Sequence, residues 1–207
     1  MIRTTAFLLA LPTLGFAHPH IFVDTDMILR VDEEGALYEV ELAFAYDEFF
    51  SLLIIEDMGV DPDGDGILTE AEKAKLFGFD VANWPDGFEG DFYVGVDGEN
   101  VSMQRSMAIG LDVVDGKLVA TQTRPIPFVD ASQAVIRQYD PTFYVQYTLQ
   151  NVSVEGPCES KVDAHDPSAG DRAVEEALKT VSDDVIDTLE LGIYYADTIR
   201  LTCSAGS

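Results

Sequence analysis

Three histidines occur among the 207 residues of this chain, and two of them, His18 and His20, follow a segment typical of a removable leader. A single basic residue, an apolar stretch and a small-x-small pattern ending at Ala17 predict a signal peptide over residues 1–17. Cleavage after Ala17 makes His18 the first residue, so that a free α-amine lies beside two imidazoles. Because imidazole suits zinc, copper and nickel, the sequence predicts a transition-metal site here, with zinc as the expected metal.

The residues around these histidines limit how the metal is held. Pro19 has no amide proton, so a chelate that uses the second backbone amide is excluded. Two modes stay open: the amine and ring of His18, or the rings of His18 and His20, which share one face of an extended chain. Asp24 lies on the same face, and His165 is the only other histidine. The predicted metal ligands are therefore His18, His20, His165 and Asp24.

Residues 61–72 match the calcium-loop pattern D-x-D/N-x-D/N-G, five residues, then E, at every fixed position. Alternate acids of such a loop point inward, and Gly66 permits its sharp bend. The expected calcium ligands are Asp61, Asp63, Asp65, the carbonyl of Ile67, Thr69 and Glu72. The alternative is a solvated turn followed by a helix-capping box between Thr69 and Glu72. Because only one such loop is visible, we expect weak, structural calcium binding.

The two cysteines, Cys158 and Cys203, do not have the spacing of a C-x-x-C redox or zinc pair. An exported protein meets an oxidising compartment, in which an even number of cysteines favours disulfide formation. The sequence therefore predicts one disulfide bond between Cys158 and Cys203.

The composition narrows the classes of partner, since 38 acidic residues outnumber 12 basic ones and give a formal net charge of -26. This charge excludes nucleic acid as an expected partner, because phosphate binding requires Lys and Arg, and it disfavours anionic membranes. It favours cations. No apolar stretch approaches the ~20 residues that span a bilayer, so we expect no stable membrane insertion. Neither a nucleophile elbow nor an H-E-x-x-H motif occurs, and the sequence does not indicate a hydrolase.

The elements that position these residues follow from the apolar spacing. Alternation predicts strands over 21–31 and 37–45, which form an antiparallel hairpin around an acidic turn. Helical spacing is expected from Phe49 to Met58 and from Glu70 to Phe77, on either side of the acidic loop. Further elements are expected as strands at 92–96, 109–114, 118–123, 133–139, 142–149 and 199–203, and as an amphipathic helix over 174–189.

These elements predict an α+β fold, with a mostly antiparallel sheet or sandwich, an EF-hand-like helix-loop-helix insert and a C-terminal helix. We expect residues 133–139 and 142–149 to be a strand pair interrupted by Asp140-Pro141. Residues 18–207 are expected to form a single periplasmic domain, with the calcium-loop insert at about 47–78.

Two segments resemble a known family. The sequence His-Pro-His-Ile-Phe-Val-Asp at 18–24 and the sequence Tyr-Asp-Pro-Thr-Phe-Tyr-Val at 139–145 resemble signatures of an uncharacterised-domain family of periplasmic proteins, and the strand ending at Cys203 fits its end. This family is described as a periplasmic component of ABC-type transport and includes ZevA-like proteins. The resemblance implies a NicO-type nickel/cobalt permease as partner and zinc acquisition as the role.

The expected function is thus a periplasmic accessory protein that binds a transition metal and serves an inner-membrane metal permease, without being an enzyme. Two alternatives stay open. One is a copper redox enzyme with a histidine brace built from His18 and His165. The other is a structural or binding module that is stabilised by calcium and binds no transition metal.

Overall fold

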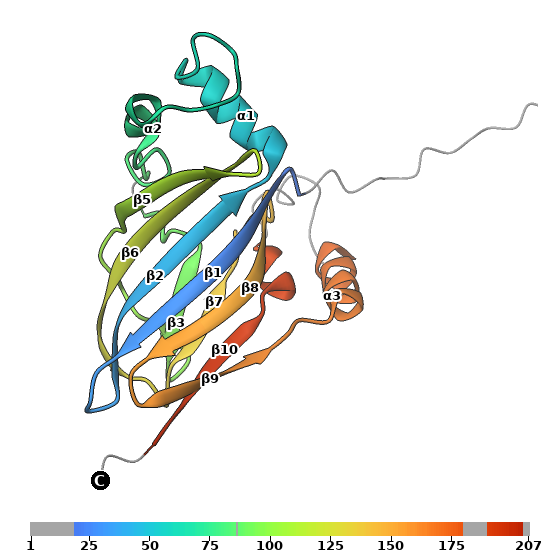
Figure 1. Ribbon diagram of the computed structural model, residues 1–207. Coiled ribbons are helices and arrows are strands. Elements are labelled where there is room, and N and C mark those ends of the chain that lie inside the picture. Colours follow the sequence, from blue (N-terminus) through green and yellow to red (C-terminus); the bar gives the residue numbers. More distant parts are fainter. Residues whose placement is uncertain (1–18, 86, 180–189, 205–207) are drawn as a thin grey trace, which may run out of the picture.

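Two five-stranded sheets pack face to face in the computed structural model, which describes residues 19–85, 87–179 and 190–204 (Figure 1). The first sheet has the strand order β5 (Met107–Val114), β6 (Lys117–Asp130), β2 (Ala36–Tyr46), β1 (Ile21–Val31) and β8 (Val145–Glu155). The second sheet has the order β4 (Glu99–Asn100), β3 (Phe92–Val96), β7 (Val135–Gln138), β10 (Thr198–Cys203) and β9 (Cys158–Asp163). The predicted signal peptide and His18 lie outside the described residues.

The hairpin of β1 and β2 confirms the predicted alternation along both strands. Val23, Met27 and Leu29 of β1 are buried in the core between the sheets, together with Val40 and Leu42 of β2. Successive side chains of a strand point to opposite faces, so the residues between them form the polar outer face of the first sheet.

The helices gather at one end of the sandwich, where β1 and β8 begin (Figure 1). They are α1 (Glu48–Asp57), α2 (Glu70–Leu76), α3 (Pro167–Lys179) and the 3-10 helix η2 (Gly192–Tyr195). Asp47 begins α1, because its carboxylate accepts a hydrogen bond from the backbone N–H of Phe50. The other oxygen of Asp47 accepts from the backbone N–H of Phe22, which ties the start of α1 to the start of β1.

The opposite end of the sandwich is closed by the predicted disulfide between Cys158 and Cys203, which joins the paired ends of β9 and β10. Gly156 turns the chain from β8 of the first sheet into β9 of the second. Its φ is +137°, and a Cβ at this position would collide with the carbonyl of Val31, so the turn requires glycine. Leu37 and Leu201 are fully or almost fully buried at this end.

The predicted pairing of residues 133–139 with residues 142–149 is wrong. β7 lies in the second sheet between β3 and β10, whereas β8 pairs with β1 in the first sheet. The β1–β8 pairing is parallel, and it is the exception to the antiparallel pattern among the described strands. The break at Asp140-Pro141 carries the chain from one sheet to the other, which local alternation cannot distinguish from a hairpin turn.

Both helices expected beside the acidic loop are present, with α1 before it and α2 after it. The predicted C-terminal helix begins earlier than expected, at Pro167, and its described part ends at Lys179. The rest of that prediction, residues 180–189, lies outside the described residues. None of the helices in the described part of the chain combines the length and the apolar character that crossing a membrane requires.

Candidate metal centre

His20 lies immediately before β1, at the end of the sandwich that carries the helices. Its backbone N–H donates to the carbonyl of Tyr144 at 2.9 Å, and the centroids of the two rings are 4.9 Å apart. This contact follows from the parallel pairing of β1 with β8, which sets Ile21 opposite Val145. The topology therefore places the segment before β1 against the segment that leads into β8.

A pocket of about 750 Å³ opens between that segment, α3 and η2. Thr142, Phe143 and Gln146, which flank Tyr144 in the chain, form one wall. The remaining walls consist of His165, Pro167, Asp171, Val174, Glu175, Leu191 and Tyr195. His20 thus contacts a residue whose neighbours line a pocket that contains one imidazole and two carboxylates.

His165 is held in this pocket by Asp197. Oδ1 of Asp197 accepts hydrogen bonds from the backbone N–H of His165 at 2.9 Å and from its Nδ1 at 2.7 Å. An ionised carboxylate has no proton to donate, so the proton of a neutral imidazole lies on Nδ1 and the lone pair lies on Nε2. The side chain of His165 is 27% exposed, which leaves the ring accessible from the pocket.

Aromatic rings and acids complete the walls. Phe143 stacks on Tyr195 with the ring centroids 4.3 Å apart, and the hydroxyl of Tyr195 donates to Asp171 at 2.9 Å. Burial raises the pKa of Tyr195 to about 12, so this hydroxyl remains a donor at neutral pH. Glu175 forms an ion pair with Lys179 at 2.9 Å. The pocket therefore offers oxygen and nitrogen atoms suited to bind a metal, next to a pair of stacked aromatic rings.

Asp24 is engaged elsewhere, on the outer face of the first sheet. Its carboxylate lies 3.1 Å from Nζ of Lys117 and accepts from Nε2 of Gln150 at 2.9 Å. The structure thus brings His20 and His165 to one end of the fold but pairs Asp24 with polar groups of β6 and β8. His18, the remaining predicted ligand, lies outside the described residues.

The model of a family described as proteins of unknown function, DUF1007, matches residues 4–203. The chain belongs to the DUF1007 family. This match confirms the expected uncharacterised-domain family, and it includes both the segment around His20 and the strand that ends at Cys203. A comparison of the DUF1007 chain with curated proteins finds no match.

The acidic loop of the DUF1007 chain gathers three carboxylates. Asp61, Asp63 and Asp65 each place one ligand oxygen within 4.8 Å of the others, and no other such group of three potential ligands occurs among the described residues. The backbone N–H groups of Gly64 and Gly66 donate to Asp61 at 3.0 Å. The hydrogen bond from the backbone of Gly66 lowers the pKa of Asp61, and a side-chain hydrogen bond with Asp61, together with the charge of Asp65, raises the pKa of Asp63. Like charges are therefore crowded where a cation would relieve their repulsion.

The second half of the loop is arranged differently. Oε2 of Glu72 accepts from the backbone N–H of Thr69 at 2.7 Å and from its hydroxyl at 2.8 Å. This is the capping box that the sequence offered as the alternative, and it occupies the carboxylate expected to close the calcium site. The side chain of Ile67 is exposed and that of Leu68 is buried, so the loop packs inward at Leu68.

One buried polar residue between the sheets, Asp91, was not predicted from the sequence. Asp91 is 4% exposed, and its carboxylate accepts from the hydroxyl of Tyr147 at 2.8 Å. Burial raises the pKa of Asp91 to about 7, and the bond from Tyr147 opposes that rise. The amide of Gln138, which is nine-tenths buried, has no hydrogen-bond partner among the described residues.

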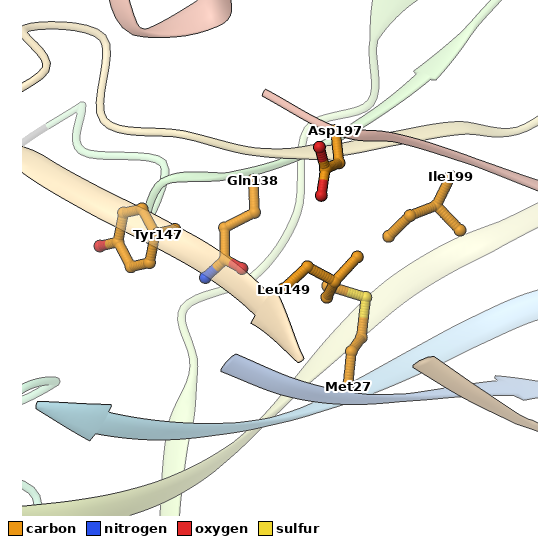
Figure 2. Close-up of a pocket in the computed structure, with 6 residues that line it drawn as sticks. All are labelled: Met27, Gln138, Tyr147, Leu149, Asp197 and Ile199. Atoms are coloured by element: carbon orange, nitrogen blue, oxygen red, sulfur yellow. The ribbon is translucent and has the colours of Figure 1, made fainter. Parts of the chain in front are cut away.

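Gln138 and Tyr147 line a small cavity of about 10 Å³ together with Met27, Leu149, Asp197 and Ile199 (Figure 2). Asp197 thus lies between this inner cavity and the outer pocket, since it also holds His165. In so acidic a chain, nothing marks Asp91 or Asp197 among the other carboxylates. The one usable signal was the even spacing of Tyr147 with Val145 and Leu149, which is typical of one strand face.

Proposed function

We propose that this DUF1007 protein is exported to the periplasm, binds zinc or another transition metal at its N-terminal histidines and serves a NicO-type metal permease of the inner membrane. The proposal includes cleavage of residues 1–17 and a single domain over residues 18–207, with the acidic-loop insert at about 47–78. The disulfide supports export, because disulfides persist in oxidising compartments and are rare in the cytosol. The permease partner rests on the family resemblance alone.

The observation that carries the metal proposal is that His20 contacts Tyr144, whose neighbours in the chain line the pocket that contains His165. His18 precedes His20 by two residues, and two residues of extended chain reach up to ~7 Å. The chain between the two histidines therefore limits how far apart their ligand atoms can lie. Imidazole nitrogens and carboxylate oxygens are also the protein donors that zinc takes in tetrahedral sites. Bound zinc would fasten the segment before β1 to the pocket.

Calorimetric titration with zinc tests this proposal on mature protein that begins at His18. We expect a His18→Ala/His20→Ala double variant to bind zinc far more weakly than wild type. A version with one extra residue before His18 separates the two chelation modes, because it weakens binding only if the α-amine is a ligand. Elemental analysis of the purified protein identifies the metal, and a redox-active copper form would favour the histidine-brace enzyme instead.

Asp24→Asn is the matched control on the same strand. It removes a carboxylate that the structure pairs with Lys117 and Gln150, so zinc affinity should not change. A loss of affinity in this variant would return Asp24 to the ligand set. Equal zinc affinity in wild type and in the double histidine variant would contradict the proposal, because the site would then lie elsewhere.

The convergence of Asp61, Asp63 and Asp65 favours a second function, namely weak calcium binding that stabilises the insert. The expected ligands remain these three acids with the carbonyl of Ile67, Thr69 and Glu72. Because Glu72 caps α2 in the structure, calcium has to compete with the capping box for its carboxylate. This competition fits an affinity in the range of ~10⁻⁴–10⁻³ M that is typical of extracellular modules.

Melting temperatures with and without millimolar calcium test this function. Calcium that binds the folded state should raise the melting temperature of wild type but not that of an Asp61→Asn/Asp63→Asn variant. Glu33→Gln/Glu34→Gln, which removes two exposed turn carboxylates outside the loop, controls for charge. An equal rise in all three proteins would show charge screening of the acidic surface and no specific site.

A further inference from the structure

We infer that Asp197 positions His165 as a metal ligand, with Nδ1 held by the Asp197 carboxylate and Nε2 directed to the pocket. The inference rests on the proposed function and names one ligand of the same site together with the residue that positions it.

The strand pairing explains why these two residues meet although they are 32 positions apart. β9 and β10 pair with Asp163 opposite Thr198, so the residues just beyond those strand ends are neighbours. Oδ1 of Asp197 then accepts from both the backbone and the ring of His165. Two bonds to one oxygen fix the ring's orientation as well as its tautomer. A carboxylate that binds the non-ligating nitrogen of a histidine is the usual outer partner of a metal-ligating imidazole.

On its inner side, Asp197 lines the small cavity between the sheets together with Gln138, and Figure 2 labels both residues among those that line it. The Gln138 amide is nine-tenths buried and has no hydrogen-bond partner among the described residues. The cavity volume of about 10 Å³ is close to the space that one water molecule requires, and such a water would link the amide to Asp197.

The hydroxyl groups of the pocket argue against a catalytic His–Asp pair. The hydroxyl of Thr142 donates to Asp140 at 2.9 Å, and that of Tyr195 donates to Asp171. Both hydroxyls are therefore committed to carboxylates, and neither is activated by His165. Asp171 and Glu175 of α3 line the same pocket as His165, and carboxylates suit a shared cation better than an attacking group.

The experiment compares zinc affinity by calorimetry and the His165 tautomer by long-range ¹H–¹⁵N NMR in the mature protein. Asp197→Asn should weaken zinc binding by ~10–100-fold, as is typical when an outer partner of a metal-ligating histidine is lost. His165→Ala should weaken it at least as much. The metal-free wild type should show a protonated Nδ1, Asp197→Asn should lose that preference, and zinc should shift the Nε2 resonance. Asp197→Glu, which keeps the carboxylate, should restore part of the affinity.

Asp163→Asn is the matched control, because Asp163 lies on the neighbouring strand end and bonds Lys161 and Arg200 outside the pocket. It removes the same charge and should leave zinc affinity unchanged. If His165→Ala and Asp197→Asn bind zinc as wild type does while the N-terminal double variant does not, the inference is wrong and the proposed function stands. If wild type binds no zinc, the proposed function fails first, and a protonated Nε2 in its spectrum would separately refute the positioning by Asp197.

Discussion

The two ends of the sandwich differ in the side chains that fill the space between the sheets. At the end closed by the disulfide, the space between the sheets holds aliphatic side chains such as Leu29, Leu37 and Leu201. At the end that carries the helices, the same space holds Asp91, Gln138 and other polar residues. His20, His165 and the pocket between α3 and β8 all lie at this second end.

This difference between the two ends shows where the fold tolerates buried polar groups that lower its stability. A buried carboxyl and an unpaired amide each destabilise the folded state unless they acquire partners. Asp91 and Gln138 lie toward the end that carries the helices, and the disulfide at the far end can offset their cost. We therefore expect the two ends to respond differently to substitution, and three predictions test this, from the largest effect to the smallest.

The largest effect is expected from the disulfide. A Cys158→Ala/Cys203→Ala variant should lose about 4 kcal/mol of unfolding free energy, as the chain-entropy model gives for a sequence separation of 45 residues. Urea unfolding measures this loss, and wild type with reductant should behave like the variant. Zinc affinity of the folded variant should be retained, because the pocket lies at the other end. An unchanged unfolding free energy would remove the basis of the comparison.

The next effect concerns Asp91 and depends on pH. Its pKa is about 7 in the folded protein against 3.8 ordinarily, so the folded state keeps a proton that the unfolded state has lost. The stability linked to this group is fully present below pH 3.8 and is lost as the pH rises through about 7. Asp91→Asn should therefore be more stable than wild type at pH 8, by at most roughly 4 kcal/mol, and close to it at pH 4.

The difference between the two unfolding curves isolates this group from the many other carboxylates. Asparagine tolerates the positive φ of 55° found at Asp91, so the variant introduces no new backbone strain. Tyr147→Phe is the complementary test, because it removes the donor that lowers the pKa of Asp91. It should widen the loss of stability above pH 7. A difference curve that is flat with pH would show that Asp91 is not desolvated.

The smallest effect is expected at Gln138. If its amide has no partner, Gln138→Leu should leave the unfolding free energy unchanged or raise it by about 1 kcal/mol. A loss of ~1–2 kcal/mol would instead show that a water molecule satisfies the amide, which would strengthen the link between Gln138 and Asp197. Leucine and glutamine have similar volumes, so packing changes contribute little. Ile136→Ala on the same strand, which leaves a cavity in the core, provides the scale of an apolar loss.

Much of the local structure could be predicted from the sequence. The hairpin of β1 and β2, both helices beside the acidic loop, the strand at 92–96 and the disulfide are all present. These features depend on near neighbours in the chain: alternation, caps, turns and a single pair of cysteines. The pairing of 133–139 with 142–149 was wrong, because a break such as Asp140-Pro141 has the same local pattern whether the chain reverses or changes sheets.

In the candidate site, too, the sequence identified the residues that belong to local patterns and missed those that depend on distant neighbours. The sequence singled out His18, His20 and the loop from Asp61 to Glu72, because each is a dense local pattern. It grouped Asp24 with the histidines by spacing alone, whereas the structure pairs that carboxylate with Lys117. Asp197 carried no signal, since one aspartate among 38 acidic residues is not distinguishable without its neighbours in space.

The sequence by itself determined the strand faces, the caps, the acidic loop and the cysteine pair, because each depends on residues within a few positions or on a choice with one solution. Only the tertiary structure decided that β1 lies parallel to β8, that His20 therefore meets Tyr144, and that Asp197 holds His165 from 32 positions away. Strand register between distant segments is set by burial summed over a whole face, and a local pattern does not contain that sum.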